Sequence, residues 1–363
     1  MKGIKKIAIS LTLILIFSFS IMSCGGSKGE VLEKTVIVSS KYPEEVNNYI
    51  AEQFKEKTGI TVKYNNKDEI KEKDFKEENI DVVLGGDKEL YTKVASQGLL
   101  KAYKTSWYND VDDNYREKEG YWYSIFRNPI IVSYNKANLV PNLIPKSLSD
   151  LKNGIYSNKI LMVNSNNPYT KYFISATASY FTKEAENNEV VGSDFLQGLK
   201  LNVATFFNDY NELFKALDVK ETPIGILPLD IFNKKIKDNA NVVKIDFQEG
   251  VPVLTECAGI LKSAPNPKAS ELFMEFIAGP KMQLELAQKF NIMPTLEVAI
   301  KYSPDWIKNF KTLDIESSTV IENEEKWVQL FNGVAKPEVQ DKNNPNNQAK
   351  NPIIKNPVNN KKS

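Results

Sequence analysis

The sequence predicts an α/β fold in which helices cover a doubly wound parallel sheet. Three kinds of segment point to this class: short runs of β-branched residues, amphipathic helical stretches between them, and glycines where a helix or strand stops. In the first third of the chain these segments alternate as strand, helix, strand, helix, strand. Alternation of this kind is typical of parallel strands joined by helical crossovers. Outside two terminal segments, about 300 residues remain, which is enough for two lobes.

The first strands are predicted over 35–39 (TVIVS), 60–64 and 80–84 (IDVVL), from buried or alternating apolar patterns. A helix between the first two opens near Pro43. Its apolar residues recur at helical spacing, and it ends at Gly59, which supplies a left-handed cap. These segments form the first repeat of the strand and helix alternation.

The charged stretch 68–78 is predicted to form a solvated helix, and 87–97 a second helix that stops at Gly98. The later chain is less regular, but it returns to the same pattern near its end. Further strands are predicted over 129–134, 159–163, 223–227 and 251–261, and further helices from Ser147, over 172–183, from Asn266-Pro267 and from Gly279-Pro280.

The N-terminus predicts export. Three lysines precede an apolar run over 7–22, which is too short for a membrane-spanning helix of about 20 residues. A basic start and a short apolar core are typical of a secretory signal. The sequence IMSC, ending at Cys24, resembles the bacterial lipobox, in which the cysteine is acylated. Residues 1–23 are therefore predicted to be a lipoprotein signal peptide and 24–34 a flexible tether; the alternative is an uncleaved anchor helix.

Composition excludes several classes of protein. The chain has no histidine, which excludes a histidine-based triad or zinc site. Its net charge is +1, and it turns slightly negative without the lysines of the signal, so no nucleic-acid partner is expected. With Cys24 acylated no disulfide can form, and Cys257 is expected to be a buried, inert thiol. The segment 336–363, rich in Asn, Pro and Lys, is predicted to be a disordered tail.

Four segments in order resemble one family. They are IAEQFKEKTGITVKY, IDVVLGGDKELYTKVASQGLLKAY, GYWYSIFRNPIIVSYNKANL with PKSLSDL, and EGVPVLTECAGILKSAPNPKASELFMEFIAGPKMQLELAQKF. Together they are similar to bacterial solute-binding proteins of ABC importers, in the branch of iron(III)-, phosphonate- and thiamine-type binders. The resemblance implies a class II periplasmic-binding-protein-like fold, with two doubly wound lobes joined by crossover strands. It assigns 31–131 plus 250–335 to lobe 1 and 132–249 to lobe 2.

Ligands of open α/β sheets bind at the carboxyl ends of the strands, which selects the first candidate residues. Ser39 and Ser40 follow the first strand and can either hold an anion or cap the next helix. Gly85, Gly86 and Asp87 end the third strand, where glycine permits either close approach of a ligand or a tight turn.

The other candidates lie near the expected cleft. Tyr121, Tyr123 and Arg127 can either wall the cleft and pair an anionic group or pack at the lobe junction. In NNPYTKY, Thr170 and Tyr172 match a turn that the family uses to open a helix. Asn208, in a polar turn, and Asp230, after the strand PIGIL, are equally compatible with a binding site or a solvated turn.

The resemblance makes ferric iron the leading ligand, since this hard cation prefers anionic oxygen atoms. Tyr172 and Asp230 are the candidate metal ligands. Many iron binders of the family carry an adjacent tyrosine pair after the strand that corresponds to PIGIL, whereas this chain has Leu229, Asp230 and Ile231 there. The alternative ligands are a small organic anion, such as a phosphonate or sulfonate, or a thiamine-like molecule.

The expected role is that of a monomer that delivers its ligand to an ABC permease and ATPase. It would work outside the cytoplasm, anchored to a membrane by acylated Cys24. The alternative hypothesis is a surface or sensory lipoprotein without a transport role. No nucleophile motif or phosphate-binding loop is found, so no enzyme activity and no cofactor other than transported iron are expected.

Overall fold

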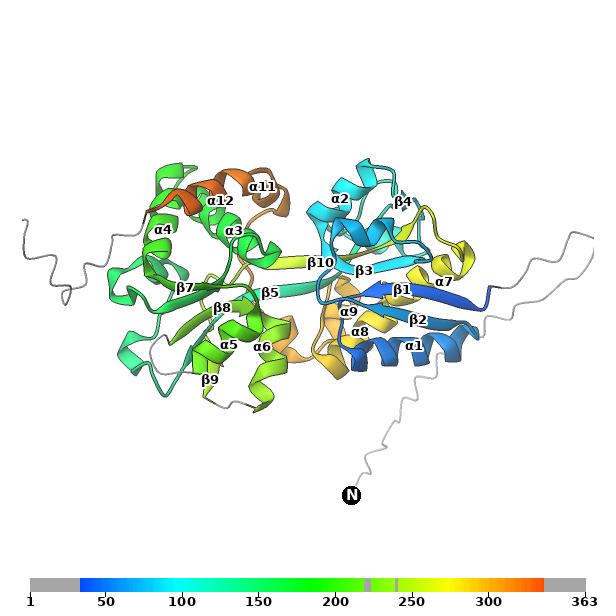
Figure 1. Cartoon of the computed structure of the whole chain (residues 1–363), viewed down its shortest axis with the longest axis horizontal. Coiled ribbons are helices and arrows are strands. Elements are labelled where there is room, and N and C mark those ends of the chain that lie inside the picture. Colours follow the sequence, from blue (N-terminus) through cyan, green and yellow to red (C-terminus); the bar gives the residue numbers. More distant parts are fainter. Residues whose placement is uncertain (1–32, 219–222, 239–240, 336–363) are drawn as a thin grey trace, which may run out of the picture.

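The computed structural model describes residues 33–218, 223–238 and 241–335. The signal peptide, Cys24, nearly all of the tether and the C-terminal tail lie outside these residues, so their predictions stand untested. Figure 1 shows two α/β lobes side by side, with the long strands β5 and β10 running between them. Among the described helices, none has the length and apolar character needed to cross a membrane.

The described strands form one mixed sheet that passes through both lobes, in the order β2-β1-β3-β10-β5-β8-β6-β7. Strands β1, β2 and β3 are parallel, as the sequence predicts, and β10 joins them antiparallel. The strands are β1 Thr35–Ser40, β2 Thr61–Asn66, β3 Val82–Asp87, β4 Leu100–Lys101, β5 Tyr123–Asn135, β6 Ile160–Val163, β7 Val203–Phe207, β8 Ile224–Pro228, β9 Val242–Lys244, β10 Val253–Leu261 and β11 Met293–Pro294.

Strand β5 changes partners as it leaves the first lobe. Its first half pairs with β10, with Arg127 opposite Thr255, and its second half pairs with β8, with Val132 opposite Ile226. The change falls between Pro129 and Ile130. Because β5 and β10 both run through this junction, the side chains they carry there lie between the lobes.

Each lobe has its own apolar core, and in each lobe helices cover both faces of the sheet (Figure 1). Cys257 is fully buried in the first lobe, which confirms the prediction of a buried thiol. The helices are α1 Glu44–Thr58, α2 Lys88–Ser96, α3 Pro168–Glu184, α4 Glu189–Asn202, α5 Tyr210–Asp218, α6 Leu229–Lys235, α7 Pro267–Ile277, α8 Pro280–Phe290, α9 Glu297–Tyr302, α10 Asp305–Lys308, α11 Ser317–Glu322 and α12 Glu324–Gly333.

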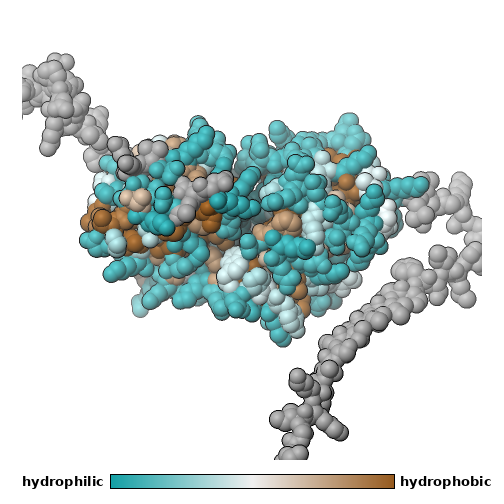
Figure 2. Space-filling view, turned by 90° about the horizontal axis from the view of Figure 1, so that it is seen from below, coloured by the Kyte–Doolittle hydropathy of each residue, from teal (hydrophilic) through white to brown (hydrophobic). Residues whose placement is uncertain are grey.

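The surface seen in Figure 2 is mainly hydrophilic, with apolar residues more frequent over the second lobe, at the left. The large apolar side chains exposed on that lobe include Val140, Ile155 and Val190. They come from separate segments of the chain, and single exposed apolar residues are normal on soluble proteins.

The last two helices belong to the second lobe. Val320 of α11 and Trp327 and Phe331 of α12 are buried in the core of that lobe, and the Trp327 Nε1 donates to Ser179 Oγ of α3 at 3.1 Å. The assignment of 250–335 as a whole to lobe 1 is therefore wrong for α11 and α12. The apolar face of a short helix does not indicate which of two lobes will bury it.

The charged stretch 68–78 is also not the solvated helix that its composition predicts. Only Glu72–Lys76 forms a helical turn, of the 3-10 type. Phe75 in this turn is buried and packs edge-on against Tyr91, with ring centroids 5.0 Å apart. Buried Asp74 accepts a hydrogen bond from the Lys71 backbone N–H at 2.6 Å, which closes the turn. One buried aromatic residue within many charges is too weak a pattern to predict this packing.

Candidate ligand-binding site

A cluster of polar side chains joins the lobes where β5 and β10 run from one lobe to the other, and we call it the Lys41 cluster. Lys41 and Tyr42 follow β1 of the first lobe, whereas Tyr169 opens α3 and Asp230 opens α6 of the second lobe. Asn128 lies on β5 and Glu256 on β10, the two strands that connect the lobes. The Lys41 cluster comprises Lys41, Tyr42, Asn128, Tyr169, Asp230 and Glu256.

Glu256 is the centre of this cluster, and its side chain is only 2% exposed. Its Oε1 accepts hydrogen bonds from Lys41 Nζ at 2.6 Å, from Asn128 Nδ2 at 3.0 Å and from the Tyr169 hydroxyl, while Oε2 accepts from the Tyr42 hydroxyl. Burial opposes the charge of Glu256, but the Lys41 ammonium and these donors outweigh burial and lower its pKa. Glu256 is therefore an ionised carboxylate with both oxygen atoms bonded.

The Lys41 ammonium contacts groups from both lobes. Besides Glu256, it donates to the Tyr169 hydroxyl at 2.5 Å and lies 3.9 Å from Asp230 Oδ2. It also lies 5.1 Å from the centre of the Tyr169 ring and 5.7 Å from that of Tyr42. Burial disfavours the ammonium, but the two carboxylates outweigh this and raise the pKa of Lys41. The cluster thus holds one buried cation among oxygen atoms and aromatic faces.

The two phenols of the cluster are protonated in this arrangement. Burial and the nearby Glu256 carboxylate raise the pKa of Tyr42 and of Tyr169 well above its ordinary value. Each hydroxyl donates its proton to Glu256. A third phenol, Tyr210, lies beside Tyr169 at a ring distance of 6.4 Å and donates to Asn167 Oδ1.

An open groove of about 500 Å³ lies between the lobes. Lobe 2 contributes asparagines to it, and lobe 1 contributes charged residues around the 3-10 turn and α2. Its lining includes Asn164, Asn166, Asn167, Asn208 and Lys171 on one side and Glu69, Lys71, Glu72, Asp87 and Glu89 on the other. A ligand of modest size can therefore enter between the lobes from this side.

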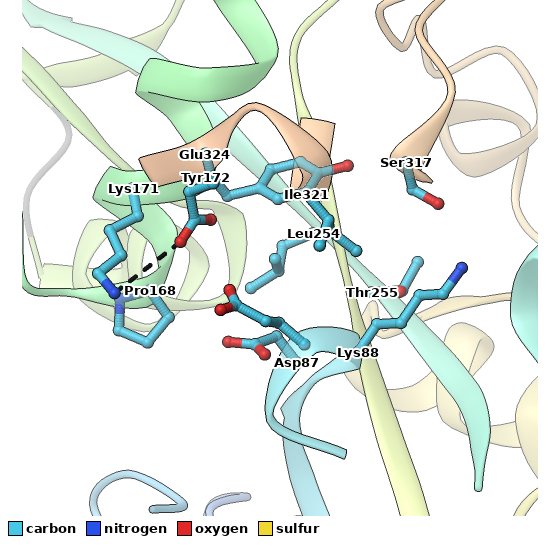
Figure 3. Close-up of a pocket in the computed structure, with 11 residues that line it drawn as sticks. Asp87, Lys88, Pro168, Lys171, Tyr172, Leu254, Thr255, Ser317, Ile321 and Glu324 are labelled. Atoms are coloured by element: carbon cyan, nitrogen blue, oxygen red, sulfur yellow. Dashed lines mark ion pairs between the residues drawn. The ribbon is translucent and has the colours of Figure 1, made fainter. Parts of the chain in front are cut away.

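A smaller cavity of about 60 Å³ shares part of this lining, and Figure 3 shows its residues. Asp87 comes from the first lobe and Lys171, Tyr172 and Glu324 from the second. The Lys171 ammonium lies 3.8 Å from Glu324 Oε1. In Figure 3 the carboxylates of Asp87 and Glu324 point into the same space. Acidic groups of the two lobes therefore face each other at this cavity.

The predicted residues at the end of β1 lie beside the Lys41 cluster, but Ser40 is engaged within the turn. Its hydroxyl donates to Asn47 Oδ1 at 2.9 Å and accepts from the Tyr42 backbone N–H at 3.2 Å. Ser39 is fully buried, and within the described residues its hydroxyl has no hydrogen-bond partner. Ser40 therefore shapes the turn that presents Lys41 and Tyr42.

The residues at the end of β3 have related roles. Gly85 and Gly86 have φ angles of +109° and +85°, and a Cβ on Gly85 would lie 2.7 Å from Lys41 Cγ. Gly85 thus leaves the space through which the Lys41 side chain passes. Asp87 caps α2 by accepting from the Leu90 N–H at 2.8 Å, and it lines both cavities.

The aromatic residues before and within β5 serve packing. Tyr123 is 1% exposed and donates to the Tyr103 carbonyl at 2.7 Å, inside the first lobe. Tyr121 packs against the core of the same lobe. Arg127 donates through Nε to the Pro294 carbonyl of β11 at 2.8 Å, and burial lowers its pKa. These contacts match the packing alternative at the lobe junction.

The structure separates the two candidate metal ligands. Asp230 belongs to the Lys41 cluster, whereas Tyr172 lines the smaller cavity. Thr170 is buried and donates to the Val163 carbonyl at 3.2 Å, while Asn208 lines the groove. Within the described residues no group of three or more His, Cys, Asp or Glu side chains is arranged to hold a metal ion.

Sequence reasoning missed most of the Lys41 cluster: Lys41, Tyr42, Asn128, Tyr169 and Glu256. One signal was available. The stretch VPVLTECAGIL is otherwise apolar, and an acidic residue in a buried strand needs a partner. The partner itself was not visible, because Lys41 lies 215 positions away in the sequence.

Burial, together with the Glu89 and Asp87 carboxylates, raises the pKa of Glu324 to about 8, and Lys171 opposes this shift. Because the pKa of Glu324 is higher in the folded than in the unfolded chain, the folded chain holds this proton more tightly. The resulting contribution to stability is complete below about pH 4, and it is lost as the pH rises through about 8. We expect Glu324→Gln to remove this loss. Between about pH 5 and pH 8, its unfolding free energy should fall by about 1–3 kcal/mol less than that of the wild type.

Urea unfolding at the two pH values measures this difference. Glu325→Gln, at an exposed neighbouring position of α12, is the matched control and should follow the wild type. Equal pH dependence in the wild type and Glu324→Gln would show that the Glu324 carboxyl does not hold its proton in the folded chain.

The two lobes, their crossing strands and the polar cluster at the crossing define a two-lobed ligand-binding protein. A family model for bacterial extracellular solute-binding proteins matches residues 77–318, and the chain belongs to this family. A probable ABC transporter periplasmic-binding protein of Sinorhizobium fredii is 25% identical over 308 residues, which cover 82% of this chain and 86% of that protein. The predicted family is confirmed.

Solved structures confirm the predicted fold. The apo ferric ion-binding protein A of Pasteurella haemolytica superposes with a TM-score of 0.68 at 18% identity, over 83% of this chain and 98% of that one. Iron-bound HitA of Pseudomonas aeruginosa gives 0.66 at 19% identity, over 83% and 99%. The protein is thus a solute-binding protein of the ABC-importer type, a transport family whose partners are a permease and an ATPase.

Proposed function

We propose that the chain is an extracytoplasmic, monomeric lipoprotein, anchored through acylated Cys24, that delivers ferric iron to its importer. The choice of ligand rests on one observation. Phenol and carboxylate oxygens from both lobes converge on a single cation, the ammonium of Lys41. A cargo cation that takes the place of this ammonium would meet the same oxygen atoms.

The chemistry of these oxygen atoms suits iron(III). Tyr42 and Tyr169 offer phenolates once their protons are lost, and Glu256 and Asp230 offer carboxylates. These are hard, anionic donors, and a trivalent cation releases the phenol protons when it binds. Similarity to ferric ion-binding proteins supports the same choice.

The proposed ligand set differs from the one that the sequence suggests. Asp230 is kept, but Tyr42 and Tyr169 replace Tyr172, because Tyr172 lies at the smaller cavity. The two phenols also stand in for the adjacent tyrosine pair, of which this chain has neither member at 229–231.

A second candidate is an organic cation, such as a thiamine-like molecule. It is favoured by the faces of Tyr42 and Tyr169, over which the Lys41 ammonium lies. A small organic anion is disfavoured at this cluster, because two carboxylates face one ammonium. The cluster therefore favours positively charged ligands over negative ones.

Ferric nitrilotriacetate added to the purified protein is expected to produce a visible tyrosine-to-iron absorption band and to raise the melting temperature. Tyr169→Phe should weaken the band and reduce iron affinity by at least about tenfold, or 1.4 kcal/mol. Tyr172→Phe is the matched control, because Tyr172 opens onto the other cavity, and it should keep the wild-type band.

A colourless mixture with an unchanged melting temperature would exclude iron. The same melting assay with thiamine and with quaternary ammonium compounds would then test the second candidate. A band lost in Tyr172→Phe but kept in Tyr169→Phe would move the iron site to the smaller cavity.

A further inference from the structure

We propose that the Lys41 ammonium is a built-in occupant of the ligand site, which draws the two lobes together without cargo and must be displaced when a cargo cation binds. The displacement step rests on the proposed cation site. The effect on lobe closure does not depend on which cation is carried, so the two ideas can be tested separately.

The first support is that Lys41 bonds across the cleft. Lys41 itself belongs to the first lobe, in the turn after β1. Its ammonium donates at 2.5 Å to Tyr169 and lies 3.9 Å from Asp230, and both of these residues belong to the second lobe. The Lys41 side chain therefore links the lobes directly, in addition to the crossing strands.

The second support is that the backbone is shaped for this side chain. The Lys41 side chain is 12% exposed, which is unusual for lysine. It passes over Gly85, where a Cβ would come within 2.7 Å of Lys41 Cγ and 3.1 Å of Cδ. A side chain at 85 would block this path, so the inward position of Lys41 is part of the fold.

The third support is electrostatic. Glu256 is almost completely buried, and a buried carboxylate without a positive partner is strongly destabilising. In the absence of cargo, Lys41 supplies that partner at 2.6 Å. A cargo cation bound by Glu256, Tyr42 and Tyr169 would supply it instead. The site then exchanges one cation for another, and the displaced ammonium swings on its flexible stem toward the groove.

This exchange weakens the binding of cargo. A site whose cation position is filled must release its own occupant first, and only the fraction of molecules with an open site can bind. Lys41 thereby sets a threshold, since a weakly held cation does not displace it whereas a cation with several strong oxygen contacts does. Lys41 is a specificity-determining residue under this proposal.

The test compares wild-type protein, Lys41→Met and Lys67→Met. Methionine keeps the length of the side chain and removes its charge. Lys67 is the matched control, because its side chain is similarly buried, at 19% exposed, and pairs with Asp74 at 3.0 Å and Glu77 at 2.5 Å inside the first lobe. Small-angle X-ray scattering reports the radius of gyration without ligand, and titration with ferric nitrilotriacetate reports affinity.

Lys41→Met is expected to have a larger ligand-free radius of gyration than the wild type, because the lobes separate by hinge motion. It should bind ferric iron at least tenfold more tightly. Lys67→Met should match the wild type in both measurements. An unchanged radius together with equal or weaker iron binding in Lys41→Met would overturn the proposal.

Two further outcomes are informative. If no protein binds iron but Lys41→Met is still expanded, the closing role of Lys41 stands and the iron proposal fails. If Lys41→Met does not fold, Asp230→Asn decides, because it removes the second-lobe carboxylate that faces Lys41 and leaves the Lys41–Glu256 pair and the Tyr169–Glu256 bond intact. An expanded ligand-free Asp230→Asn supports the proposal, and a radius equal to that of the wild type contradicts it.

Discussion

Glu256→Ala is expected to lower the free energy of unfolding by about 3–5 kcal/mol and to abolish the ferric absorption band. The loss is large because the Lys41 ammonium stays buried without its carboxylate partner. Three neutral donors, from Tyr42, Asn128 and Tyr169, lose their acceptor at the same time. Urea unfolding, followed by circular dichroism, measures the first effect, and iron titration measures the second.

Glu275→Ala is the matched control for Glu256→Ala. Glu275 also accepts several hydrogen bonds, from the Ser106 N–H at 2.8 Å, the Ser106 hydroxyl at 2.6 Å and the Tyr103 hydroxyl at 3.0 Å, but it lies away from the cluster. Its replacement should cost less stability and leave iron binding intact. A Glu256→Ala protein that unfolds within about 1 kcal/mol of the wild type would show that the ion pair contributes little.

Trp327→Ala is expected to cost about 3–5 kcal/mol, the usual range for removing a large buried aromatic side chain. Trp327 is 2% exposed in the second-lobe core, and its indole donates to Ser179 Oγ at 3.1 Å. Without it, α12 loses a buried ring from this core and its hydrogen bond to α3. Urea unfolding gives the energy, and hydrogen exchange should show faster exchange in α11 and α12 than elsewhere.

Trp306→Ala separates this effect from the loss of any tryptophan. Trp306 of α10 is 36% exposed, so its replacement should cost less than about 1 kcal/mol. Trp327→Ala should keep the ferric band where it stays folded, since α12 contributes no side chain to the Lys41 cluster. Wild-type stability in Trp327→Ala would mean that α12 is not held by this core.

Much of the first lobe could be predicted from the sequence. The runs that became β1, α1, β2, β3 and α2 each carry a pattern of apolar residues that depends only on neighbouring positions. Such patterns report local geometry because side chains repeat every two residues in a strand and about every 3.6 in a helix. The prediction of a solvated helix over 68–78 was wrong because it used local pattern alone, whereas the burial of Phe75 depends on Tyr91, outside that stretch.

The candidate site could be predicted only in part. The strand-end rule selected Ser39, Ser40 and the residues from Gly85 to Asp87. Of these, Asp87 lines the groove, Gly85 lies against the Lys41 side chain, and Ser40 shapes the turn that holds Lys41. The rule did not select Lys41, which immediately follows Ser40, because lysine is common on surfaces and its burial here depends on a glycine in another strand. The apolar pattern that predicted where the strands end could not predict that the Lys41 side chain turns inward.

The sequence alone determined the α/β class and the two-lobed family, and it predicted the ends of strands as the place for a ligand, because these follow from local periodicity and from segments that resemble the family. Only the tertiary structure decided that Lys41, Tyr169 and Glu256 meet, and that α11 and α12 pack on the second lobe. Both outcomes depend on strand register and on the relative placement of the lobes. These are properties of contacts between distant parts of the chain, which no local pattern records.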